Sequence, residues 1–248
     1  MTEKLSNEEL ESRFGDVEEN LKVIRENIAR AAQQSGRRPE DITLLAATKT
    51  VPVEVVNRSI ELGVDYIGEN RVQELTDKYE SYDLERCRLH FIGHLQVNKV
   101  KYLVGRVAMI QSVDSEKLAA EISRLSVKKG ITTDVLLEVN IGREESKSGV
   151  MPELLPELLE KVSRLPAVRV RGLMAIPPAG ASEAENRNFF LRMDQYFVDT
   201  KREKSDNVSM DYLSMGMSAD YPQAILAGAN MVRVGTALYG PRNYAIKR

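Results

Sequence analysis

The sequence is poor in the side chains that disulfides and most metal sites require. Its 248 residues include one cysteine, Cys87, two histidines, His90 and His94, and no tryptophan. A single cysteine excludes a disulfide within the chain and a cluster of thiolates, and it is typical of a reducing compartment. Because no cysteine or carboxylate cluster accompanies the two histidines, we expect no metal site.

The chain also lacks a strong charge of either sign and lacks long hydrophobic runs. Lysine and arginine total 35 against 37 aspartates and glutamates, which gives a net charge of −2. This balance gives no reason to expect nucleic acid or an anionic membrane as a partner. No apolar run approaches the roughly 18 residues of a membrane span, and the charged residues 1–14 do not resemble a secretory signal. We therefore expect a cytoplasmic protein.

What the sequence does contain is a regular alternation of apolar and amphipathic segments. Apolar runs predict strands at 42–50, 65–67, 88–92, 108–112, 134–139, 168–175, 212–215 and 231–234. Amphipathic segments predict helices between them at 53–62, 71–79, 97–104, 115–129, 151–165, 182–201 and 219–227. A further amphipathic helix is expected at 17–34, ahead of the first strand.

Strict alternation of strands and helices favours a parallel sheet. Eight such units in a chain of about 250 residues match the size of a (β/α)8 TIM-type barrel. We therefore expect one α/β domain over residues 1–248, with an extra N-terminal helix. An open doubly wound sheet is the alternative, but that fold usually carries a glycine-rich turn after its first strand, and residues 49–52 read KTVP.

Lys49 follows the apolar run of the first predicted strand. A lysine at the end of a buried strand is costly unless its amine pairs, reaches water or is used chemically. Desolvation lowers the pKa of an amine and makes it a nucleophile. Lys49 is therefore a candidate nucleophile, and the alternative is a lysine whose stem covers the core while its ammonium reaches water.

Polar side chains follow most of the other predicted strands, among them Asn70, His94, Asp114 and Asn140. In a barrel these side chains would converge on one mouth, at the carboxyl ends of the strands, where active sites of this fold lie. We interpret His94 as a hydrogen-bonded loop residue rather than a base, and Asp114 as a helix cap rather than a catalyst. The helix at 115–129 is expected to be capped by Ser115 or Asp114.

The ends of the last two strands combine glycines with hydroxyl side chains. They are residues 214–218 (SMGMS) and 233–236 (RVGT). Backbone N–H groups at helix starts bind phosphate, and the loops after strands 7 and 8 are the usual phosphate site of this barrel. A lysine facing a phosphate site favours a phosphorylated aldehyde bound as a Schiff base, with a phosphosugar lyase or isomerase as the alternative.

Seven stretches of the chain resemble the pyridoxal phosphate homeostasis protein family, which is related to the amino-terminal barrel of alanine racemase. They are LLAATKT (44–50), YIGENRVQE (66–74), HFIGHLQVNK (90–99), EVNIGREESKSG (138–149), RGLMAIP (171–177), LSMGMSAD (213–220) and VRVGTALYG (232–240). They extend over about four fifths of the chain in family order. Their combination is specific, although no single stretch is.

The resemblance implies that pyridoxal 5′-phosphate (PLP) forms a Schiff base with Lys49. It also implies that Asn70 lines the cofactor ring or its 3-hydroxyl side and that Arg233 faces the pyridine nitrogen. The phosphate would be held by the loops after strands 7 and 8, with Ser214, Met215, Gly216, Ser218, Gly235 and Thr236 as cofactor-binding residues. Lys147 matches a second lysine of the family and is a candidate secondary PLP site for cofactor entry or exit, whereas Arg71 receives no role.

The chemistry of Arg233 bears on the expected activity. A guanidinium only donates hydrogen bonds, so a pyridine nitrogen facing it stays unprotonated and the ring becomes a weaker electron sink. Racemization needs two bases, and alanine racemases take the second from an additional carboxyl-terminal β-domain, whereas this sequence ends shortly after the eighth predicted strand. We therefore expect a monomeric, non-catalytic PLP carrier.

Three functions follow from these expectations. The first is intracellular PLP homeostasis, in which the protein stores or buffers the cofactor or delivers it to PLP-dependent apoenzymes. The second is a small PLP-dependent amino-acid racemase, and the third is a Schiff-base aldolase that acts on phosphosugars. A yellow bound cofactor would separate the first two from the aldolase.

Overall fold

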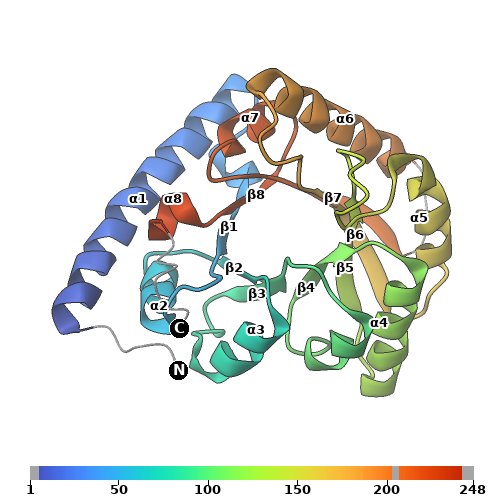
Figure 1. Cartoon of the computed structure of the whole chain (residues 1–248), viewed down its shortest axis with the longest axis horizontal. Helices are drawn as coiled ribbons and strands as arrows, with labels where there is room; N and C mark the ends of the chain where they lie inside the picture. The colour runs from blue at the N-terminus through green and yellow to red at the C-terminus, as the bar shows by residue number, and fades with distance from the viewer. Residues whose placement is uncertain (1–5, 203–206, 242–248) are drawn as a thin grey trace.

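The computed structural model describes residues 6–202 and 207–241, and its centre is a closed barrel of eight parallel strands in chain order (Figure 1). The strands are β1 (Thr43–Ala47), β2 (Tyr66–Glu69), β3 (Arg88–Phe91), β4 (Met109–Val113), β5 (Thr133–Val139), β6 (Val168–Ala175), β7 (Val208–Met217) and β8 (Met231–Val234). β8 pairs with β1 from Thr43↔Met231 to Ala46↔Val234, which closes the ring. The predicted barrel is confirmed and the open sheet is excluded.

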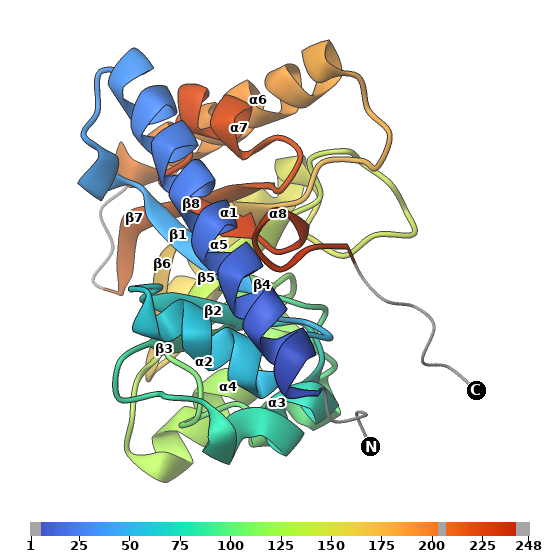
Figure 2. The ribbon, with the colours of Figure 1, turned by 90° about the vertical axis from the view of Figure 1, so that its left-hand side faces the viewer.

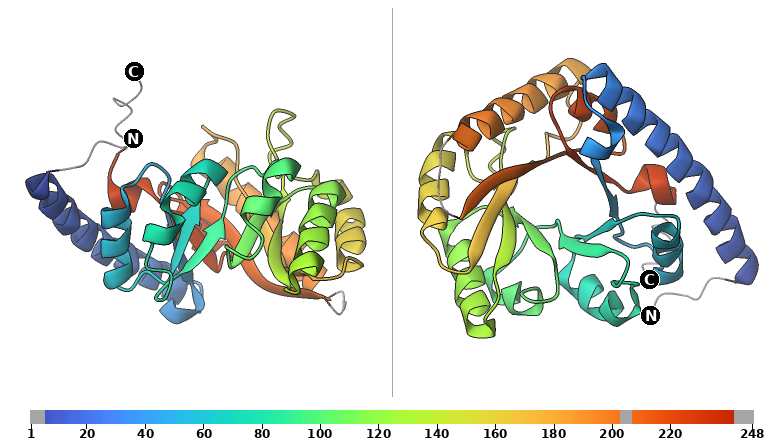
Figure 3. Two further views of the ribbon diagram at one scale, coloured as in Figure 1. Left: turned by 90° about the horizontal axis from the view of Figure 1, so that it is seen from below. Right: turned by 180° about the vertical axis from the view of Figure 1, so that it is seen from behind.

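Helices surround the barrel on its outside, as both views of Figure 3 show. They are α1 (Asn7–Gln34), α2 (Val53–Glu61), α3 (Val72–Lys78), α4 (Glu116–Lys129), α5 (Leu155–Ser163), α6 (Glu183–Arg202), α7 (Tyr221–Leu226) and α8 (Thr236–Tyr239). Short 3-10 helices lie at η1 (Pro39–Asp41), η2 (Tyr79–Ser81), η3 (Val97–Tyr102) and η4 (Pro152–Leu154). Within residues 6–202 and 207–241, none of the helices combines the length and apolar character that crossing a bilayer requires.

Two of the differences from the predicted elements have identifiable reasons. α1 begins at Asn7 rather than at residue 17, because Ser6 and Glu9 form a capping box that starts the helix ahead of its buried face. The segment expected to be an α-helix at 97–104 is the 3-10 helix η3 instead. Only Val100 of η3 is buried, so little apolar surface is available to stabilise a longer helix.

The long helix α1 lies diagonally across the outside of the barrel, over the junction of β1 and β8 (Figure 2). Its apolar face is buried from Val17 to Ala32. Its polar side chains bind the ends of three other helices: Arg25 donates to the carbonyl of Leu62 after α2 at 2.9 Å, Asn27 to the hydroxyl of Tyr221 in α7 at 2.9 Å, and Asn20 to the carbonyl of Leu238 in α8 at 3.1 Å. α1 therefore holds the last elements of the barrel against the first.

The barrel interior contains both apolar and polar side chains. The apolar ones come from five strands and from the residue after β3, namely Leu45, Ala47, Ile92, Met109, Leu136, Met174 and Met231. The polar side chains of His90, Gln111, Ser214 and Arg233 are buried inside the same barrel. Barrels of this type usually contain branched apolar residues at such positions, so these four buried polar side chains are unusual.

Candidate functional site

Lys49 lies in the turn that follows β1, at the carboxyl end of the barrel. The strand ends at Ala47, Thr48 is fully buried and Lys49 is half-buried. Carboxyl ends of parallel strands in a barrel converge on one mouth. The structure therefore places Lys49 where the sequence predicted it, at the end of the first buried strand.

The start of this turn is fixed by a buried carboxylate that sequence reasoning missed. Thr48 donates its hydroxyl to Glu69 Oε1 at 3.0 Å, and Tyr82 donates to the same oxygen at 2.6 Å. Glu69 is fully buried at the end of β2, and Lys78 Nζ lies 3.3 Å from its Oε1. Burial, followed by the charge of Glu69, raises the pKa of Tyr82 above its usual range, so the phenol keeps its proton.

The far side of the turn is held by helix α3. The backbone N–H of Thr50 donates to Glu74 Oε2 at 3.0 Å, and Lys78 Nζ donates to the carbonyl of Val51 at 3.0 Å. Thr50 has a φ of 63°, in the left-handed region that a β-branched residue rarely adopts. Such a conformation persists only where its surroundings hold it. The turn that carries Lys49 is therefore held rigidly.

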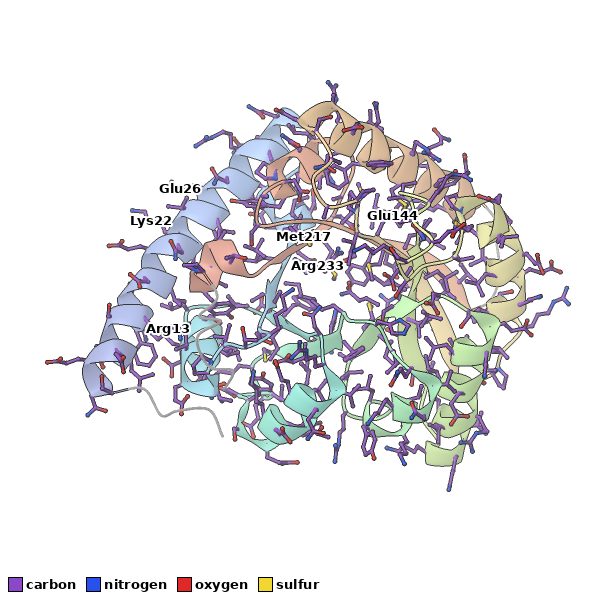
Figure 4. All side chains as sticks on the ribbon, in the orientation of Figure 1. Arg13, Lys22, Glu26, Glu144, Met217 and Arg233 are labelled. Carbon is purple, nitrogen blue, oxygen red and sulfur yellow. The ribbon has the colours of Figure 1, made fainter. Side chains whose placement is uncertain are left out.

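Arg233 lies on β8 inside the barrel and is 3% exposed. Figure 4 labels Arg233 near the centre of the barrel. Its Nη1 donates to Ser214 Oγ at 2.6 Å and its Nη2 to the carbonyl of Ala175 at 3.0 Å. Burial lowers its pKa to about 10, against the opposing effect of Glu138, so the guanidinium remains charged at neutral pH. None of the carboxylates in the described part of the chain forms an ion pair with it.

The last residues of β7 alternate between the barrel interior and the layer that packs against the helices. The Ser214 hydroxyl is fully buried and already donates to Gln111 Oε1 at 2.7 Å while it accepts from Arg233. Met215 belongs to the core between the barrel and the helices. A Cβ on Gly216 would lie 2.5 Å from the Cβ of Ala224, so this glycine permits α7 to pack closely. The side chains at these three positions are therefore engaged within the protein, and their assignment as cofactor-binding residues stays a prediction that would rest on their backbone N–H groups.

Ser218 and the start of α8 meet directly. The backbone N–H groups of Gly235 and Ala237 both donate to Ser218 Oγ at 3.1 Å. Thr236 stands exposed between them. A Cβ on Gly235 would lie 3.1 Å from the carbonyl oxygen of Ala47, so the loop passes close to the end of β1. Converging N–H groups, a hydroxyl and Lys49 therefore share one side of the mouth.

Asn70 stands beside Lys49 at the end of β2. Its Oδ1 is buried and finds no hydrogen-bond partner among residues 6–202 and 207–241. The backbone of Asn70 is fixed, since a Cβ on Gly93 would lie 2.0 Å from the Asn70 carbonyl oxygen. A hollow of about 440 Å³ adjoins this wall and is lined also by Arg71, His94 and Lys99.

The loop between β5 and α5 contacts His94, which follows β3. The Asn140 side chain holds this loop, because its Nδ2 donates to the carbonyl of Glu144 at 2.8 Å and its Oδ1 accepts from the Glu144 N–H at 3.1 Å. Ser148 Oγ lies 2.9 Å from His94 Nδ1, which agrees with the interpretation of His94 as a hydrogen-bonded loop residue. Lys147 is exposed on this loop.

Glu138 on β5 is a second ionisable group that sequence reasoning missed. It lies two residues beyond Leu136, whose side chain is inside the barrel, so alternation directs it inward as well. Burial, followed by the charge of Asp114, raises its pKa to about 7, whereas Arg233 opposes the rise. Its Oε2 is buried without a hydrogen-bond partner in the described part of the chain.

Of the two expected caps of α4, Ser115 is confirmed and Asp114 is wrong. Ser115 is the N-cap, and its hydroxyl accepts from the N–H of Leu118. Asp114 instead raises the pKa of Glu138. Groups of three or more histidine, cysteine or carboxylate side chains that could hold a metal ion are absent from residues 6–202 and 207–241.

Comparison with known proteins agrees with this arrangement. The model of the alanine racemase N-terminal domain family matches residues 20–243. The chain is 46% identical over 226 residues to the pyridoxal phosphate homeostasis protein of Aquifex aeolicus, covering 91% of this chain and 98% of that protein. It is 38% identical to the protein of the same name from Escherichia coli K12, covering 94% and 100%. The chain belongs to the pyridoxal phosphate homeostasis protein family.

Solved structures extend the comparison. The structure of PipY from Synechococcus elongatus with PLP bound is 32% identical, with a TM-score of 0.78, and covers 90% of this chain and 100% of that one. Alanine racemase from Clostridium difficile is 18% identical with a TM-score of 0.70 and covers 92% of this chain but 57% of that one. The second match shows a shared barrel only.

The raised pKa of Glu138 predicts how the stability of the folded protein changes with pH. Its pKa rises from 4.5 to about 7 on folding, so the folded protein binds this proton more tightly than the unfolded chain does. The resulting contribution to stability is fully present below about pH 4.5 and is lost as pH rises through about 7, by on the order of 3 kcal/mol. The variant Glu138→Gln should lose less stability between these pH values, as urea denaturation would measure.

The exposed Glu145→Gln is the matched control for Glu138→Gln, because Glu145 lies on the surface of the loop after β5. It should follow the pH profile of the unmodified protein. Parallel profiles for the unmodified protein and Glu138→Gln would show that Glu138 is not a buried acid with a raised pKa.

Proposed function

We propose that this protein binds PLP at the barrel mouth and acts as a cytoplasmic carrier that stores, buffers or delivers the cofactor. Support comes from relatives named for PLP homeostasis that match nearly the whole chain, and from the PipY structure with PLP bound. The observation that carries the proposal is the buried guanidinium of Arg233 at the base of a mouth that also holds Lys49.

The residues present fit the chemical groups of PLP. The cofactor supplies an aldehyde that condenses with a primary amine, together with a phosphate and a pyridine nitrogen. Lys49 supplies the amine, and Arg233 supplies a charged donor for a ring nitrogen. Ser218 and Thr236 supply hydroxyl groups suited to a phosphate, and the N–H of Gly235 holds the Ser218 hydroxyl by donating to its Oγ. The buried Oδ1 of Asn70 is an acceptor suited to a donor on the ligand.

The mouth favours retention of the cofactor over catalysis. Arg233 can donate but cannot give up its proton at neutral pH, since its pKa lies at about 10. A ring nitrogen that faces it therefore stays without a proton, which weakens the ring as an electron sink. We infer that residues of the mouth bind and orient the cofactor and that PLP-dependent apoenzymes are its recipients. Lys147, on the exposed loop, remains the candidate secondary PLP site, and a monomer remains the expected state.

One observation favours a small amino-acid racemase as the second candidate. β5 stands opposite β1 in the ring of eight strands, so Glu138 and Lys49 lie on opposite walls. A pKa near 7 suits Glu138 to exchange protons at neutral pH. Two groups that exchange protons from opposite walls are what racemization requires, and only a measurement of proton exchange separates the candidates.

Replacement of Lys49 tests the attachment of the cofactor. Lys49→Ala should abolish the yellow colour of the PLP-loaded protein, because it removes the amine that binds the aldehyde. Borohydride reduction followed by peptide mapping identifies the labelled lysine. Lys147→Ala is the control and should leave the label on Lys49. A label on another lysine of the unmodified protein, with none on Lys49, would end the assignment.

Replacement of hydroxyl groups tests the phosphate seat. Ser218→Ala or Thr236→Val should weaken PLP retention by about 10-fold to 100-fold, since each removes a hydrogen bond to a charged group worth roughly 1.5–3 kcal/mol. Equilibrium dialysis measures the dissociation constant, and Lys49 should still be labelled by borohydride. Ser209→Ala, at the amino end of β7, is the control. Unchanged affinity in both test variants would place the phosphate elsewhere.

Exchange of the α-proton separates the carrier from the racemase. The PLP-loaded protein should not exchange the α-proton of L-alanine or L-serine in heavy water at an enzymatic rate, because Arg233 leaves the ring a weak electron sink. Proton NMR of the amino acid follows the exchange. A rate on the order of 1 s⁻¹ that Glu138→Gln abolishes would establish the racemase instead.

A further inference from the structure

A chain of buried polar side chains crosses the barrel interior beneath Arg233. Gln111 on β4 and Ser214 on β7 are both fully buried, and His90 on β3 is 2% exposed. Gln111 Oε1 accepts from Ser214 at 2.7 Å, and Gln111 Nε2 lies 2.9 Å from His90 Nδ1. With Arg233, the chain joins four strands, and its central bond spans the barrel from β4 to β7.

The hydrogen bonds between Arg233 and His90 can be donated in one direction only, because the chemistry of these two end residues fixes which atoms donate. Arg233 can only donate, so Ser214 Oγ must accept from it and must direct its own proton to Gln111 Oε1. The amide of Gln111 then presents its Nε2 hydrogens to His90. Burial lowers the pKa of His90 to about 3, so the imidazole is neutral, Nδ1 accepts and Nε2 carries the hydrogen.

We propose that Gln111 is a positioning residue that, through Ser214, fixes the plane and direction of the Arg233 guanidinium toward the barrel mouth. His90 is the anchor of this chain, because its bare Nδ1 determines which way the Gln111 amide faces. The carbonyl of Ala175 holds the other end of the guanidinium at 3.0 Å. The role of Gln111 in cofactor binding rests on the proposed function, whereas its role in positioning Arg233 does not.

Physical requirements single out an amide at position 111. The side chain must accept from Ser214 and donate to a neutral imidazole at the same time, and only an amide has a fixed acceptor and a fixed donor. Methionine has a similar length but supplies neither a donor nor a strong acceptor, so Ser214 Oγ would lose the acceptor that fixes its orientation. A carboxylate would still accept from Ser214 but would require His90 to donate.

The test begins with NMR of the cofactor-free protein labelled with ¹⁵N. In the unmodified protein the Arg233 guanidinium should show separate Nη signals, because its bonds restrict rotation, and His90 should show the tautomer with hydrogen on Nε2. Gln111→Met should average the Arg233 signals. Gln111→Glu should preserve them and move the hydrogen of His90 to Nδ1 or protonate its ring, a change that loss of stability alone would not produce.

Binding of PLP then connects positioning with the proposed function. Gln111→Met should weaken PLP retention about 10-fold or more, while borohydride still labels Lys49. Met174→Leu is the matched control, because Met174 also lies inside the barrel and leucine keeps its apolar character. This control should change neither the Arg233 signals nor PLP retention. If Gln111→Met does not fold, Ser214→Ala removes the same link to Arg233.

Separate Arg233 signals in both Gln111→Met and Ser214→Ala would overturn the proposal. Averaged signals in the unmodified protein would overturn it as well. If the NMR results are as expected but the unmodified protein does not retain PLP, the positioning chain stands and the proposed function fails. The positioning of Arg233 by Gln111 and the proposed binding of PLP are therefore tested independently.

Discussion

The burial of one positive charge, that of Arg233, is the constraint on which the barrel mouth depends. A guanidinium with five donors cannot be enclosed in an apolar barrel without acceptors. Ser214 and the carbonyl of Ala175 supply two of them. Ser214 in turn donates to Gln111, and Gln111 forms a hydrogen bond with His90. The barrel interior therefore contains polar side chains among its apolar ones. The charge also acts on Glu138, whose pKa it lowers against a larger effect of burial.

The turn that carries Lys49, at another part of the mouth, is held by carboxylates. Lys49 lies on a turn whose residues are bound to carboxylates of β2 and α3, chiefly Glu69 and Glu74. Lys78 neutralises that pair and also binds the carbonyl of Val51. These contacts fix Thr48, Thr50 and Val51, the residues on either side of Lys49, and so hold the turn in place.

Agreement between sequence and structure is greatest where a local rule operates. Alternation of segments predicted all eight strands, and the apolar run before Lys49 placed this residue at the correct strand end. The capping box of Ser6 and Glu9 was present in the sequence and could have revealed the true start of α1. The 3-10 form of η3 could not be read in this way, since it depends on how little of that segment its neighbours bury.

By itself, the sequence determined the fold class, the family and the set of strand ends that meet at the mouth, because periodicity and motif order are local properties of the chain. Only the tertiary structure decided what each side chain does there. Ser214 and Ser218 look equivalent in the sequence, yet one is buried beneath Arg233 and the other receives two N–H groups. Glu138 acquires its raised pKa from burial and from Asp114, a residue on another strand end, and such effects arise only when distant segments are brought together.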